Sequence, residues 1–117
     1  MILPEELLAY NHLIDSIQQM DFREEEGISQ LRMKIRLIDA SFLNIREIKK
    51  HNEILAYSYY WLDSNNHVIT GWDNAPHHKE LETFPHHKHM RDNVLPSEET
   101  CLGDILKYID SLLNPVE

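Results

Sequence analysis

The chain has 117 residues, about the size of one domain, and its apolar content of 42% is enough for one modest core. No stretch approaches the roughly 20 consecutive apolar residues that a membrane span needs, and the single cysteine excludes an intrachain disulfide. The formal net charge of −9 at first argues against a nucleic-acid partner.

The first segment, residues 4–20, is predicted to form a helix. Pro4 suits a first helical turn, and the two glutamates after it complement the positive end of the helix dipole. A charged break follows at 21–27. Residues 31–39 then alternate between apolar and basic side chains, which is the pattern of a half-buried strand.

Three further strands are predicted, at 42–49, 53–62 and 67–72. The segment 73–96 has no regular period and is interpreted as a long loop. Ser97 is expected to cap a final helix, in which an apolar stripe recurs at helical spacing over 102–113. The order predicts one α+β domain over residues 1–117, a short antiparallel meander of about four strands flanked by an N-terminal and a C-terminal helix.

Charge is distributed unevenly along the chain. Residues 1–26 carry seven acids against one Arg and residues 92–117 carry six acids against one Lys, whereas 27–91 carries nine Lys or Arg against seven acids. Local potential, not net charge, decides what a surface attracts, so the central part can still meet RNA. The basic side chains of the first predicted strand are therefore expected to contact phosphate: Arg32, Lys34 and Arg36. An ordinary solvated face is the alternative.

The most distinctive segment is the histidine-rich loop 73–91. It contains Pro-His-His-Lys at 76–79 and again, nine residues later, at 85–88. Histidine titrates near neutral pH, so two histidines in opposite protonation states can act as general acid and general base. The candidates are His77, His78, His86, His87 and His89, with Asp73 to orient one imidazole. Three cations are expected to hold phosphate: Lys79, Lys88 and Arg91.

Several chemistries remain open for this loop. The leading one is cleavage of an RNA phosphodiester through the 2′-hydroxyl, with no metal and no other cofactor. The same histidines with Glu80 and Glu82 could instead hold zinc, although their spacing matches no His-Glu-x-x-His signature. A solvated polar loop is a further alternative. Nucleotide transfer ranks last because the glycines form no phosphate-cradling loop. Cys101 is expected to be a small structural residue, since a nucleophilic thiol needs a neighbouring base or cation.

The run from Trp72 to His89 also resembles the signature of the TumE family of prokaryotic toxin–antitoxin proteins. The aromatic strand 57–63 and the segment 94–98 are similar to that family too, so the resemblance spans roughly 28–113. It implies the toxin of a two-gene module, whose partner is a small antitoxin expected to carry a DNA-binding fold. It assigns no catalytic residue. Because many toxins of such modules are ribonucleases, the analogy favours RNA cleavage.

We therefore expect a cytoplasmic toxin that acts on RNA as a metal-independent endoribonuclease. Acids stand near the N-terminus where a signal peptide would carry Lys or Arg, and no membrane partner is expected. The alternatives are a non-catalytic protein- or RNA-binding module that the antitoxin neutralises, and a metal-dependent hydrolase that uses the histidine cluster. A second copy of the chain is a further candidate partner.

Overall fold

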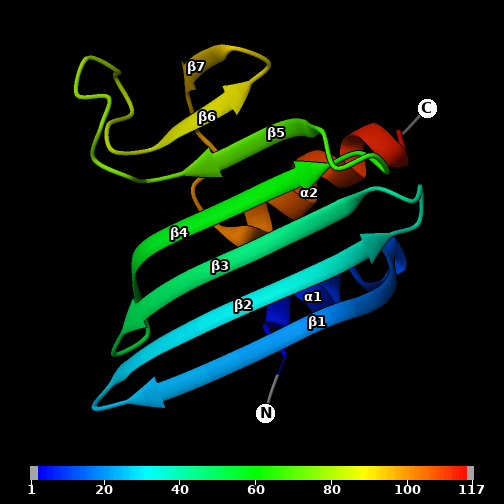
Figure 1. Cartoon of the computed structure of the whole chain (residues 1–117), viewed down its shortest axis with the longest axis horizontal. Coiled ribbons are helices and arrows are strands. Elements are labelled where there is room, and N and C mark those ends of the chain that lie inside the picture. Colours follow the sequence, from blue (N-terminus) through cyan, green and yellow to red (C-terminus); the bar gives the residue numbers. More distant parts are fainter. Residues whose placement is uncertain (1–2, 116–117) are drawn as a thin grey trace.

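The computed structural model describes residues 3–115, so the outer two residues at each end of the expected domain lie outside the described part. One antiparallel sheet of seven strands, arranged in chain order, forms the body of the molecule (Figure 1). The strands are β1 (Ile14–Glu25), β2 (Ile28–Leu37), β3 (Phe42–Lys50), β4 (Glu53–Leu62), β5 (Val68–Asp73), β6 (His87–Met90) and β7 (Asn93–Pro96). The helices are α1 (Glu5–Ala9), the short 3₁₀ helix η1 (Asn11–Leu13) and α2 (Leu102–Leu113). The α+β class and the meander are confirmed, but the count of about four strands is too low.

The predicted helix at 4–20 is wrong beyond its first turns. Helix α1 ends at Ala9, and residues 14–25 form β1, which pairs with β2 along its whole length. Helix propensity is a weak signal that pairing with a long neighbouring strand readily overrides. The expected charged break lies inside this hairpin, and Glu26 and Gly27 make its two-residue turn with φ values of 51° and 81°. Positive φ at both positions is what a two-residue hairpin turn of type I′ requires.

The predicted loop 73–96 is also partly wrong, because its second half forms the hairpin of β6 and β7. Strand β6 pairs with β5, so the histidine-rich segment completes the sheet (Figure 1). The sequence His-Lys-His-Met lacks the apolar alternation that identified the other strands.

The expected cap at Ser97 is wrong as well. Helix α2 begins at Leu102. The buried Ser97 hydroxyl donates to the Glu99 carbonyl, 2.8 Å away in the segment before the helix.

Among residues 3–115, no helix is long and apolar enough to cross a bilayer.

Both helices pack on the same face of the sheet (Figure 1), where one continuous core joins α1, α2 and the central strands. The alternation of β2 is confirmed, since Leu31, Met33, Ile35 and Leu37 are all buried beneath the helices. Three aromatic side chains of β4 also belong to this core: Tyr57, Tyr59 and Trp61. The opposite side of the sheet, here called the open face, carries the basic residues of β2.

Candidate functional site

A row of directly opposed residues crosses the open face from the basic residues of β2 to the histidines of β6. Arg32 of β2 lies opposite Arg46 of β3, which lies opposite Ser58 of β4. Ser58 in turn lies opposite Asp73 of β5, and Asp73 lies opposite His87 of β6. Directly opposed residues point to the same side of a sheet. The sheet therefore places a cationic end and a histidine end on one surface.

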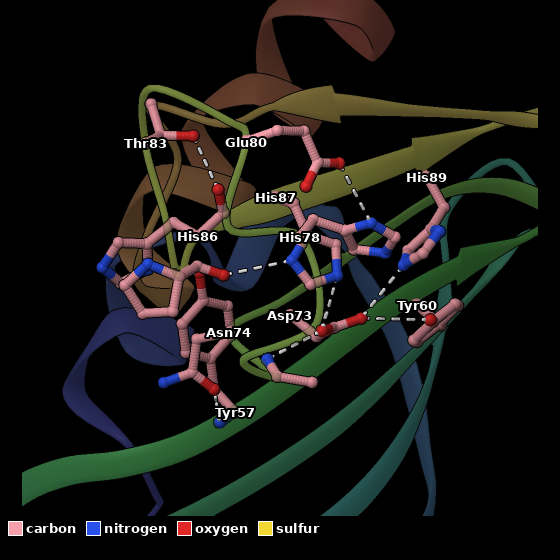
Figure 2. A network of polar contacts seen from close by, with 12 residues as sticks. Tyr57, Tyr60, Asp73, Asn74, His78, Glu80, Thr83, His86, His87 and His89 are labelled. Atoms are coloured by element: carbon pink, nitrogen blue, oxygen red, sulfur yellow. Dashed lines mark hydrogen bonds and ion pairs between the residues drawn. The ribbon is translucent and has the colours of Figure 1, made fainter.

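Asp73 is the centre of the histidine end. Figure 2 shows its carboxylate shared between two imidazoles, with His87 Nε2 2.8 Å from one oxygen and His89 Nε2 3.2 Å from the other. The backbone N–H of Ala75 donates to the first oxygen at 3.0 Å, and the Tyr60 hydroxyl lies 3.4 Å from the second. Asp73, which the sequence predicts to orient one imidazole, lies in contact with two.

His87 is fixed from both sides. Its Nδ1 lies 3.1 Å from the Pro85 carbonyl oxygen and its Nε2 lies 2.8 Å from Asp73, so an acceptor oxygen faces each ring nitrogen. Its side chain is only 3% exposed. His87 is therefore held in one orientation and cannot itself reach a large ligand.

His78 and His89 are the two histidines of the cluster that solvent reaches. Each side chain is 31% exposed, and their ring centroids lie 6.3 Å apart. His78 leans on the ring of His87 at 4.9 Å, and its Nδ1 is 3.6 Å from Glu80. His89 stacks on Tyr60. Burial and the neighbouring Asp73 charge raise the pKa of Tyr60, which keeps its hydroxyl protonated as a donor to Asp73.

Each Pro-His-His-Lys repeat contributes only one of its two histidines to the cluster. The second histidine of each, His78 and His87, joins the cluster, whereas the first of each does not. His77 is exposed at the turn after β5, and His86 points away towards Tyr57, whose hydroxyl is 2.8 Å from its Nδ1 (Figure 2). Burial, followed by the charge of Asp73, raises the pKa of Tyr57. The repeat thus supplies two positions of the site, and the strand residue His89 supplies a third.

The residues predicted to contact phosphate lie in different parts of the molecule. Lys88 lies on the helix side of β6, where its ammonium is 3.2 Å from Glu99. Lys79 is exposed in the loop, and Arg91 is exposed in the turn between β6 and β7. Arg36 is on the open face but pairs with Asp15 at 3.4 Å.

Two adjoining hollows, of about 440 and 240 Å³, run across the open face. Arg46 and Tyr60 line both of them. The larger hollow includes the predicted contacts Arg32 and Lys34, and the smaller ends at Asp73. We call this surface the open-face groove. The sequence did not single out Tyr60, and only the cross-strand register reveals it. A further cavity, of about 570 Å³, lies beside α1 on the helix side, away from the histidines.

Three of these residues could hold a metal ion. Asp73, His87 and His89 each offer one ligand atom, and these atoms lie within 4.8 Å of one another. Imidazole nitrogen and carboxylate oxygen are ligands that zinc accepts, although the two rings contact different oxygens of Asp73, at 2.8 and 3.2 Å. The contact from His87 Nδ1 to a backbone carbonyl is of the kind that orients metal-ligating histidines.

The fold and the site together define an α+β protein with a histidine–aspartate cluster at the end of a basic groove on its open sheet face. The chain belongs to the Toxin TumE family, whose model matches residues 4–115. It is thus the toxin of a toxin–antitoxin module, and its partner is an antitoxin. The resemblance drawn from the sequence is confirmed and covers nearly the whole chain. A search of curated proteins and a search of solved structures found no match.

Proposed function

We propose that this toxin cleaves RNA on its open face, with histidines moving the protons and without a metal ion. The observation that carries the proposal is the pair His78 and His89, two solvent-reached imidazoles 6.3 Å apart beside a groove lined by arginines. A phosphate group held between two nitrogens, each at a charge-assisted distance of about 2.8 Å, needs them roughly 6–8 Å apart. Two rings whose centroids lie 6.3 Å apart can present their outer nitrogens at such a separation, so the pair could flank one phosphodiester.

The remaining residues of the cluster would position this pair. Asp73 holds Nε2 of His89, which leaves Nδ1 as the nitrogen free to exchange a proton with substrate. His87 and Tyr60 hold Asp73 in turn. Asp73 and His87 are accordingly positioning residues, because neither needs to touch RNA.

In the proposed reaction, one imidazole of the pair takes the proton from a ribose 2′-hydroxyl. The 2′-oxygen attacks phosphorus, the bond from phosphorus to the 5′-oxygen breaks, and the second imidazole gives that oxygen a proton. The products are a 2′,3′-cyclic phosphate and a 5′-hydroxyl end. Arg32, Lys34 and Arg46 would bind neighbouring phosphates in the groove and stabilise the charge that develops.

The test uses untagged protein, a single-stranded RNA oligonucleotide and EDTA. Wild type should cut the RNA, leave its all-2′-deoxy analogue intact and produce cyclic phosphate ends. His78→Ala and His89→Ala should each lower the rate by about 10²–10⁴-fold. His77→Ala is the matched control, since His77 is an exposed neighbour in the same loop outside the cluster. RNA that stays intact in EDTA would refute the proposal, and cutting restored only by zinc or manganese would establish a metal-dependent hydrolase.

A non-catalytic binding module is the second candidate, favoured by the groove, which could hold RNA without any proton transfer. Expression in cells separates the two. Growth arrest by the folded double variant His78→Ala/His89→Ala, with antitoxin binding retained, would favour the binding module. In either case we propose that the protein acts in the cytoplasm, where a DNA-binding antitoxin and RNA are both present.

A further inference from the structure

Strand β1 is one edge of the sheet, and among residues 3–115 its outer side has no strand partner (Figure 1). Natural edge strands are usually shielded by proline, lysine, bulges or a covering segment. The first half of β1 has such irregularities, with register shifts at 14–16 and 17–19. From Gln19 to Glu25 the pairing with β2 is regular and the stretch contains no proline. It does carry charges, but of both signs, so this half of β1 can accept a strand whose charges are complementary.

The residues of this stretch are complementary to themselves. In an antiparallel pair of identical strands centred on Phe22, Asp21 of each copy lies opposite Arg23 of the other, on the open-face side. Phe22, 43% exposed, lies opposite its own copy. One residue further from the centre on each side, Met20 of one copy lies opposite Glu24 of the other. This register therefore forms two ion pairs and one aromatic pair, and no acid lies directly opposite another acid.

The neighbouring registers are unfavourable. Directly opposed residues must lie on the same face of the joined sheet. The two-fold axis must therefore pass through a residue of β1, not between two residues, and each alternative register is centred on a different residue. Centring on Asp21, Arg23 or Glu24 places that charge opposite its own copy. Centring on Met20 extends the pairing through the irregular stretch at 17–19. Like charges directly opposite destabilise a strand pair, which leaves Phe22 as the favoured centre.

We infer that two copies of this protein associate through β1, antiparallel about Phe22, so that their sheets join into one. The two-fold axis then runs through the sheet, and both open faces lie on the same side. The open-face groove begins at β2 and β3, next to this seam, so the two grooves become neighbours while the histidine clusters lie at the far ends. This association does not depend on RNA cleavage.

Charge exchange tests the proposal. Asp21→Arg and Arg23→Asp each turn both ion pairs into like-charge pairs, and each should raise the dissociation constant of the dimer at least about tenfold. The double variant Asp21→Arg/Arg23→Asp should restore it. Mixing the two single variants should also restore pairing, because each then supplies the charge that the other lacks. Asp92→Arg, in an exposed turn at the opposite edge, is the matched control.

The readout is molar mass by light scattering over a range of concentrations, with circular dichroism to confirm folding. A wild type that stays monomeric at every concentration would overturn the inference. So would a folded double variant, or a mixture of the single variants, that does not associate. If wild type is monomeric but Asp21→Arg abolishes antitoxin binding, the edge receives a basic segment of the antitoxin and the second-copy proposal is wrong.

Discussion

Replacing Asp73 with alanine removes the carboxylate on which the histidine cluster is assembled. Loss of the contact with His87 should carry its whole cost in stability, because that imidazole is 3% exposed and water cannot replace the lost carboxylate. A buried hydrogen-bonding group left without a partner costs about 1–3 kcal/mol. The N–H of Ala75 also loses its acceptor, at roughly 1 kcal/mol. His89, 31% exposed, can turn to solvent and contributes little. We expect the free energy of unfolding to fall by about 3 kcal/mol, a large part of the roughly 5–15 kcal/mol of a typical domain.

Urea denaturation followed by tryptophan fluorescence measures this loss, and the fully buried Trp72 beside the substituted position reports on it. Asp73→Asn keeps an acceptor for the Ala75 N–H and should cost less. Asp92→Ala, in an exposed turn, should stay within about 0.5 kcal/mol of wild type. A loss below about 1 kcal/mol for Asp73→Ala, at an unchanged denaturant slope, would show that the bond from His87 to Asp73 is not the buried contact described.

Three further predictions each concern one residue: Gly71, Cys101 and Lys88. Gly71→Ala would place a Cβ 2.3 Å from the Tyr60 ring, so the free energy of unfolding should fall by about 1–3 kcal/mol in thermal denaturation; an unchanged melting temperature would contradict this. Burial raises the pKa of the Cys101 thiol, so at pH 8 a disulfide reagent should modify it more slowly in the folded protein than in urea; equal rates would contradict its partial burial. Lys88→Ala should leave RNA-oligonucleotide affinity unchanged, because that ammonium pairs with Glu99 on the helix side; a clear loss would place Lys88 in the RNA contact.

Strand β2 is the strand that an uninterrupted period of two revealed in the sequence. Strand β2 alternates without a break because its apolar residues all meet the helices. Strand β1 was missed because its register shifts, at 14–16 and 17–19, interrupt the period and leave Ile14, Ile17 and Met20 at helix-like spacing. Most of its other residues are exposed, so burial added little to the pattern.

The density of histidines located the site but could not select among them. Residues two apart on a strand share a face, so the pair His87 and His89 was a usable signal once 87–90 is known to be a strand. The same rule turns Lys88 to the other side. The path of the chain between β5 and β6 brings His78 into the cluster and keeps His77 and His86 out of it. The sequence shows no period in this segment, so that path could not be predicted.

The opposition of Asp73 to His87 and of Gly71 to His89 has a consequence for insertions and deletions. The alignment of β5 with β6 specifies the positions of Asp73, His87 and His89, whereas the position of His78 depends on the connection between the two strands at 74–86. A residue added near Glu80 could bulge outward and leave the three side chains in place. A slip of one residue in the pairing would instead turn both imidazoles towards the helices and bring Lys88 to the open face. A change of loop length should therefore displace His78 but keep the contacts of Asp73 with His87 and His89, whereas a shift of one strand against the other should lose all of these contacts.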